Sequence, residues 1–267
     1  MWDIILDAIF QCIQFFAHVV GDWGLGIIII TLIFRLLITP LMYKQAKSSF
    51  QMQKIQPLIK EIQTKYADDQ VKQSNEMQRL YAEAKFNPLA SCIPMLIQMP
   101  IFIALFQVLR GMADTTSRFY QSGSDFCFYN LVPNLVISPS DSLGMVADQG
   151  VLYAVPYFLL LIIFAVCTFI PSILQMKDVS DEKQRNQTLM MTFIMGIMML
   201  FIGWSSPAGV LLFWGASSIL AIIQQQGSLS IIRKKYKEEQ ANKPYVPEPV
   251  KIEVTRKKQK KRQTKKR

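Results

Sequence analysis

Five long apolar stretches run along the chain, and each is long enough to cross a lipid bilayer. A helix needs about 20 apolar residues to span the hydrocarbon. The predicted spans cover residues 24–43, 89–109, 151–171, 188–204 and 207–226. Ser, Pro and Gly at 205–209 favour a turn between the last two spans. The pattern therefore predicts an all-α integral membrane protein with five transmembrane helices.

Residues 1–20 show a different pattern, in which polar side chains recur at steps of three and four along one helical face. These side chains are Asp3, Asp7, Gln11, Gln14 and His18. The opposite face is apolar, so the segment is predicted to be an amphipathic helix. Such a helix suits the outer interface of the membrane, and packing of the helix on the bundle is an equally consistent interpretation.

Three polar regions separate or follow the spans. Residues 44–87 are rich in helix formers and contain a turn sequence at 67–70, which predicts a two-helix hairpin outside the bilayer. Residues 110–150 are punctuated by Gly, Ser, Pro and Asp, which predicts a loop. Residues 233–267 are basic and nearly devoid of apolar side chains, so they are predicted to be a disordered tail. Residues 21–232 form the predicted core.

Composition agrees with a membrane protein, and the placement of charge predicts its orientation. The 267 residues are 51% hydrophobic and 18% charged. Residues 227–267 hold 15 Lys/Arg against 4 acidic residues, and the hairpin holds 8 Lys/Arg, whereas loop 110–150 holds 2. Because cytoplasmic segments carry the excess of Lys/Arg, the hairpin and tail are predicted to be cytoplasmic. Five spans then place the N-terminus outside.

Arg35 is the only charge within the first span and lies twelve residues into it. A charge at the centre of a bilayer costs at least roughly 2.5–3.5 kcal/mol, so Arg35 should face protein or water. Thr31 and Thr39 lie one turn to either side on the same face. No span contains an acidic residue that could neutralise Arg35. The functional interpretation is a hydrated cavity with a cation for an anionic partner; the structural alternative is that Arg35 locks the bundle through hydrogen bonds.

Other chemistry is sparse. The chain has one His and no P-loop motif, and its four Cys show no metal-ligand spacing, so we expect neither an enzyme nor a cofactor or metal site. Span 188–204 is rich in Met, including Met191, Met195 and Met198, which suits either ordinary packing or a surface for varied apolar segments. An anion channel or carrier around Arg35 is the alternative function, and a scaffold for a translocon is a third.

Four blocks of sequence resemble, in order, the YidC-type membrane protein insertases. They are GLGIIIITLIFRLLITPL, KIQPLIKEIQTKYADD, NPLASCIPMLIQMPIFIALF and SSPAGVLLFWGASSILAIIQQ. The resemblance implies a five-span core around a hydrophilic groove that opens to the cytoplasm and to lipid and is closed outside. It also implies insertion of nascent membrane proteins without ATP, in a bacterial plasma membrane.

The resemblance places the groove at Arg35 and Thr31 and at an aromatic pair of the last span, Phe213 and Trp214. With the polar residues of the spans, the predicted substrate groove comprises Arg35, Thr31, Thr39, Gln98, Thr168, Ser217, Phe213 and Trp214. The family's sliding surface falls on spans 2 and 4, here Met95, Ile101, Met191, Met195 and Met198. The hairpin corresponds to a segment required for activity in the family.

The chain departs from the family at three positions. Phe213 stands where a tyrosine is often found, Cys167 where some members have glutamine, and Gly196 where a proline is common. The large outer domain and extra N-terminal span of Gram-negative members are not expected, so the chain resembles a minimal, Gram-positive-type member. Expected partners are nascent membrane proteins, the Sec translocon and signal recognition machinery, and, for the tail, ribosomal RNA or anionic lipid.

Overall fold

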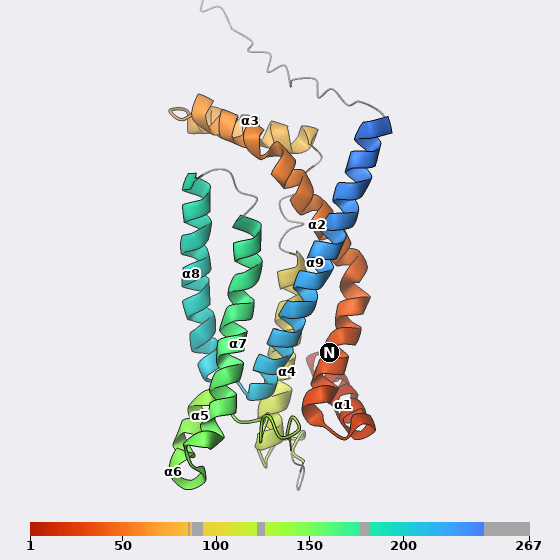
Figure 1. Ribbon diagram of the computed structural model, residues 1–267, viewed down its shortest axis with the longest axis vertical. Coiled ribbons are helices and arrows are strands. Elements are labelled where there is room, and N and C mark those ends of the chain that lie inside the picture. The colour runs from red at the N-terminus through yellow and green to blue at the C-terminus, as the bar shows by residue number, and fades with distance from the viewer. Residues whose placement is uncertain (85, 87–92, 122–125, 177–181, 243–267) are drawn as a thin grey trace, which may run out of the picture.

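The computed structural model describes residues 1–84, 86, 93–121, 126–176 and 182–242 (Figure 1). These residues are helical without a named strand, which confirms the all-α prediction. Six of the described helices are long and apolar enough to cross a membrane. They are α1 (Trp2–Val20), α2 (Trp23–Lys65), α4 (Ile93–Ala113), α7 (Val151–Met176), α8 (Glu182–Trp204) and α9 (Ala208–Asn242). Helix α1 is the segment predicted to be amphipathic, and the other five overlap the predicted spans, of which residues 89–92 lie outside the described part.

Helix α2 joins the first predicted span to the first arm of the hairpin without a break, so one helix contributes to both segments. Pro40 and Pro57 lie inside the helix, and each removes one backbone hydrogen bond and favours a kink. Figure 1 shows α2 bending away from the bundle toward α3. At residue 44 the side chains change from mainly apolar to mainly polar, while strong helix formers continue on both sides. The pattern therefore marks a change in the surroundings of the helix.

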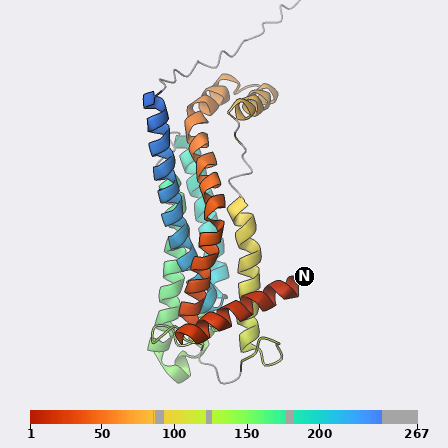
Figure 2. The ribbon, with the colours of Figure 1, turned by 90° about the vertical axis from the view of Figure 1, so that its right-hand side faces the viewer.

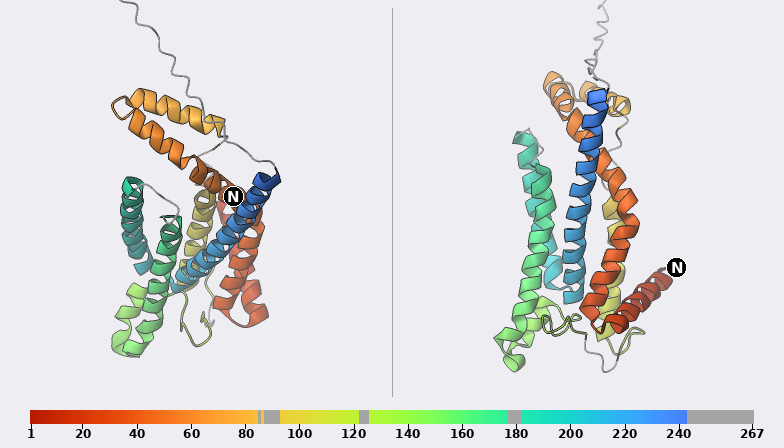
Figure 3. Two further views of the ribbon diagram at one scale, coloured as in Figure 1. Left: turned by 45° about the horizontal axis from the view of Figure 1, so that its top comes forward. Right: turned by 45° about the vertical axis from the view of Figure 1, so that its right-hand side comes forward.

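The hairpin consists of the second half of α2 and α3 (Gln70–Glu83). Its own small core contains Ile55, Ile59, Ile62, Leu80 and Phe86. Asp69 caps α3 by accepting from the backbone N–H of Lys72 at 3.1 Å. The Lys72 side chain also donates to Asp69, and this hydrogen bond lowers the pKa of the Asp69 carboxyl. Figure 3 shows the hairpin at the end of the bundle opposite α1.

Helix α9 continues ten residues beyond the predicted start of the disordered tail, so the predicted boundary at residue 233 is wrong. Leu229 and Ile232 of α9 are buried against Ala46 of α2. The ring of Tyr236 meets Phe50 at 5.7 Å between centroids. These apolar contacts hold the basic segment as a helix along α2. Residues 243–267 lie outside the described part.

Helices α7 and α8 lie side by side (Figures 1 and 3). Gly196 of α8 faces the ring of Phe169, and a Cβ at Gly196 would come within 2.0 Å of that ring. Gly203 similarly faces Leu161 and Phe164 of α7. The absence of a side chain at Gly196 therefore allows close packing of α8 on α7.

The main apolar core lies at the end of the bundle away from the hairpin. It joins α1, the first turns of α2 and α9, the last turns of α4 and the segment between α4 and α7. Its buried members include Ile13, Ile27, Leu109, Met112, Leu135, Tyr157 and Val210. The short helices α5 (Pro139–Gly144) and α6 (Val146–Gln149) cover the start of α7. This core fills one end of the bundle, here named the sealed end, which is predicted to face outward.

Helix α1 crosses α2 and α4 obliquely near this sealed end (Figure 2). Its buried side chains face the bundle, while Ile4, Phe15 and Val19 are exposed. Arg118, after α4, pairs with Asp3 at 3.1 Å and Asp7 at 3.3 Å. Helix α1 thus packs on the bundle along one side and exposes apolar side chains along another. This arrangement is consistent with both interpretations of its pattern, packing on the bundle and a position at the membrane interface.

Asp22, between α1 and α2, is a buried carboxylate with two backbone partners. Its Oδ1 accepts from the N–H of Leu25 at 2.7 Å, which caps α2. Its Oδ2 accepts from the N–H of Tyr129, whose φ of 44° is in the left-handed region. Asp22 therefore ties the start of α2 to a strained turn of the loop after α4.

Asp22→Ala is expected to lower the free energy of unfolding by about 1–2 kcal/mol, because the cap is lost and two part-buried N–H groups lose their acceptor. Thermal unfolding in detergent measures this change. Asp68→Ala, at an exposed position in the hairpin turn, is the control and should leave the midpoint unchanged. Equal midpoints for the two variants would contradict the role assigned to Asp22.

Candidate functional site

Arg35 lies between α2 and α9 and is 8% exposed. Its Nε donates to the hydroxyl oxygen of Ser217 at 2.8 Å, and its Nη2 donates to the same oxygen. Ser217 is itself buried, on α9. The guanidinium therefore has a neutral hydrogen-bond partner, as the structural interpretation of Arg35 requires. The hydrogen bonds to Ser217 fit the alternative that Arg35 joins two helices, and they leave open its predicted role as a cation for an anionic partner.

The charge of Arg35 nevertheless has no counter-ion in the described part of the chain, where no acidic side chain pairs with it. A serine hydroxyl can accept these hydrogen bonds but cannot neutralise a positive charge. Inside an apolar bundle, a full charge held by one hydroxyl attracts any anion that can approach it. The hydrogen bonds to Ser217 therefore leave the charge of Arg35 without compensation.

The two threonines near Arg35 have different environments. Thr31 is fully buried, and its hydroxyl donates to the carbonyl of Ile27 at 2.6 Å. Thr39 donates to the carbonyl of Arg35 at 3.0 Å and accepts from Nε2 of Gln224 at 2.8 Å. Thr39 thus belongs to a polar cluster with Arg35, whereas the hydroxyl of Thr31 is satisfied within its own helix.

Gln98 and Thr168 lie on other helices. Gln98 of α4 is partly buried, and its Nε2 is buried without a hydrogen-bond partner among the described residues. Thr168 of α7 donates to the carbonyl of Phe164 at 2.8 Å. Neither side chain forms a hydrogen bond with Arg35. An unpaired buried amide donor is unfavourable by about 1–3 kcal/mol, so Gln98 is the stronger candidate for contact with a polar segment.

The aromatic pair of α9 divides between two environments. Phe213 is buried in the core at the sealed end. Trp214 packs edge-on against Phe102 of α4 at 5.4 Å and against Phe164 of α7 at 5.7 Å. Trp214 therefore links α4, α7 and α9. Phe213, which has no hydroxyl, fits this apolar core without needing a partner.

The predicted sliding surface is mainly exposed on α8. Met191, Met195 and Met198 are exposed, together with Phe193, Ile194 and Ile197. Ile101 of α4 is partly buried against the main core. Met95 lies in the first turn of α4, and its side chain is outside the described part. Because α8 packs through its glycines, most of its flexible apolar side chains remain free to contact lipid or another helix.

A cavity of about 420 Å³ lies between α4 and α8. Its lining includes Phe102, Ile103, Phe106 and Gln107 of α4, with Phe201, Ile202, Ser205 and Ser206 from the end of α8 and the turn after it. The side chain of Gln107 accepts from Nε1 of Trp2 at 2.9 Å. The two helices predicted to guide substrates thus face a shared, mostly apolar hollow. The sequence pattern does not reveal it, because the lining residues are distant along the chain.

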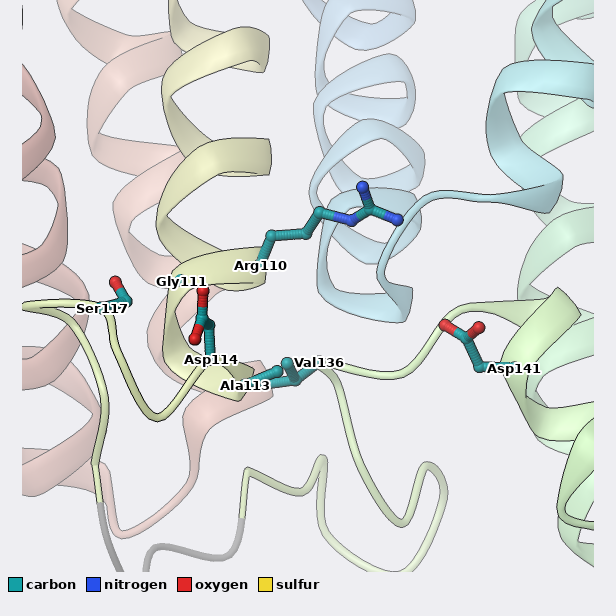
Figure 4. A pocket seen from close by; sticks show the side chains of 7 residues that line it. All are labelled: Arg110, Gly111, Ala113, Asp114, Ser117, Val136 and Asp141. Carbon is teal, nitrogen blue, oxygen red and sulfur yellow. The ribbon is translucent and has the colours of Figure 1, made fainter.

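A second hollow, of about 400 Å³, lies at the sealed end and is more polar. Arg110 extends from α4 beside it, with Asp114 at the end of that helix and Asp141 on α5 (Figure 4). A hydrogen bond from Thr116 lowers the pKa of the Asp114 carboxyl. This hollow is separate from Arg35 and belongs to the loops of the sealed end.

Residues 15–239 match the family described as the 60Kd inner membrane protein. A relative named membrane protein insertase YidC 1, from Lactococcus lactis, is 36% identical over 228 residues, covering 84% of this chain and 74% of its own length. The chain belongs to the YidC-type membrane protein insertases. The matched residues include Arg35, Ser217 and the hairpin.

Other YidC proteins support the assignment. The membrane protein insertase YidC of Fusobacterium nucleatum is 33% identical, covering 77% of this chain and 85% of the relative. A crystal structure of an active YidC insertase has a TM-score of 0.57 and 26% identity, and the match covers 84% of this chain and 46% of that one. Family membership makes this chain a multi-pass membrane protein that acts on other membrane proteins.

Proposed function

We propose that this YidC-type insertase moves nascent membrane proteins into the bilayer through a groove organised around Arg35, without ATP. The burial of Arg35 without an acidic partner among the described residues is the observation that carries the proposal. A short leading segment of the substrate, often acidic, enters beside Arg35, and its interaction with the guanidinium offsets part of the desolvation of its carboxylates. The similarity to insertases leaves the anion-carrier alternative without support.

Release into lipid needs no further energy source in this proposal. The substrate's apolar helix moves past α4 and α8, where the cavity between them and the exposed Met side chains of α8 offer a flexible apolar surface. Transfer of the helix from water to hydrocarbon is strongly favourable. The hydrophobic effect therefore drives the step, while Arg35 lowers the barrier for the polar segment.

Orientation follows from the distribution of Lys and Arg. The hairpin and the basic end of α9 lie at one end of the bundle and α1 at the other (Figure 1). Placing the basic end in the cytoplasm puts the N-terminus outside and gives substrates access from the cytoplasm. The Lys/Arg residues beyond residue 233 then serve to hold anionic lipids or ribosomal RNA, and the translocon is a further partner.

Photo-crosslinking to a stalled nascent chain tests the proposed route. A photoreactive residue at Met195 on α8 should crosslink to the apolar segment of the chain, because this side chain faces the proposed path. A probe at Leu37, which is 73% exposed and lies on the face of α2 opposite Arg35, is the control. Equal crosslinking from the two positions would contradict the route.

A further inference from the structure

Two polar links join the turn of α2 that carries Arg35 to α9. The first is the pair of hydrogen bonds from the Arg35 guanidinium to Ser217. The second comes from Gln224, whose Nε2 donates to the carbonyl of Arg35 at 2.8 Å and to the hydroxyl of Thr39 at 2.8 Å. Ser217 and Gln224 are about two turns apart on one face of α9. Arg35 is thus held at its side chain and at its backbone by the same helix.

The orientation of the Gln224 amide follows from its partners. A backbone carbonyl only accepts, so the amide atom facing Arg35 must be the nitrogen. Thr39 gives its own proton to the same carbonyl and therefore also accepts from Gln224. The amide oxygen of Gln224 points away from this cluster and is buried without a partner among the described residues. A reversed amide would place two acceptors against each other.

Pro40 explains why this turn of α2 requires external support. Proline has no N–H, so the carbonyl of Leu36 loses its partner within the helix, and the ring favours a kink. The turn between Arg35 and Thr39 directly precedes this defect. The side chain of Gln224 reaches from α9 and donates to the carbonyl of Arg35. This hydrogen bond restrains the backbone from which the Arg35 side chain extends.

We infer that Gln224 is a positioning residue for Arg35: it fixes the backbone of the α2 turn so that the guanidinium is held at the height of Ser217. This inference rests on the proposed role of Arg35 in receiving acidic segments. Gln224 acts on the substrate through Arg35 and does not itself contact the carboxylate. Substitution of Gln224 should therefore lower the insertion of acidic substrates selectively, and only in a protein that retains Arg35.

The test compares two single-span reporter substrates whose leading segments differ only in two Asp residues or two Asn residues. Gln224→Met keeps an unbranched side chain of similar length and removes the donor. It should lower insertion of the Asp reporter about fivefold, the loss expected for a hydrogen bond of ordinary strength, and change the Asn reporter less than about twofold. In the Arg35→Ala background, the same substitution should cause no further loss.

Gln226→Met is the matched control, because Gln226 is exposed two positions along the same helix. Detergent thermal unfolding of each variant separates misfolding from mispositioning. Equal losses on both reporters, or an additive loss in the Arg35→Ala background, would overturn the inference and assign Gln224 a general structural role. If Gln224→Met inserts the Asp reporter as well as the wild type does while Arg35→Ala is impaired, the inference is overturned and the proposed function stands. Wild-type insertion by Arg35→Ala overturns the proposed function and, with it, the inference.

Discussion

Arg35→Ala is expected to lower the insertion of substrates with acidic leading segments at least tenfold, whereas Arg35→Lys should retain much of the activity. A unit charge about 4 Å from a carboxylate contributes about 4 kcal/mol at an effective dielectric constant near 20, and a tenfold change needs only about 1.4 kcal/mol of this. Lysine keeps the charge but loses the paired donors that Nε and Nη2 direct to Ser217.

Pulse labelling with protease protection of the reporter measures the inserted fraction. A reporter with an uncharged leading segment is the control and should depend on Arg35 far less. Ser217→Ala separates the hydrogen bonds of Arg35 with Ser217 from the attraction between Arg35 and the substrate, because it removes the neutral acceptor and leaves the charge. Equal insertion of the acidic reporter by the wild type, Arg35→Ala and Arg35→Lys would refute a charge-based mechanism.

The spans could be predicted from the sequence because the bilayer imposes a length and a composition on each of them. Their continuation outside the bilayer could not be predicted in the same way. At residue 44 the charge content changes while helix propensity does not, so the sequence marks the end of the span but does not show that one helix continues into the hairpin. At residue 233 the charges suggested disorder, yet Leu229, Ile232 and Tyr236 provide apolar contacts that hold the helix on α2.

The candidate site shows a similar division. The sequence identifies Arg35 as an exceptional residue, since a charge within a span is costly wherever it lies. It does not show which polar residue receives the guanidinium, because this depends on how α9 is rotated against α2. Gln224, Gln225 and Gln226 are consecutive, and only packing determines that Gln224 faces Arg35 and Thr39. The polar face of residues 1–20 was visible, but its pairing with Arg118 required the fold.

The sealed end of the bundle depends on Tyr157 of α7, which is fully buried in the main core. Its hydroxyl accepts from the backbone N–H of Asn134 at 3.1 Å and donates to the hydroxyl of Tyr153 at 3.4 Å. The hydroxyl therefore joins α7 to the segment that follows α4. Two substitutions distinguish the contribution of the ring from that of the hydroxyl.

Tyr157→Ala is expected to lower the free energy of unfolding by about 3–5 kcal/mol, because a large cavity opens in the core. Tyr157→Phe keeps the ring and should lower it by about 1–2 kcal/mol, through the lost acceptor for Asn134. Thermal unfolding in detergent gives the order of the midpoints, and Tyr120→Ala, at an exposed position after α4, is the control. If Tyr157→Ala unfolds no earlier than Tyr120→Ala, this core does not limit stability. A second measurement uses a cysteine introduced by Ala208→Cys in the first turn of α9. If Tyr157→Ala makes this cysteine reactive to thiol reagents, whereas Tyr157→Phe and Tyr120→Ala do not, then the core closes the groove on the side opposite the hairpin.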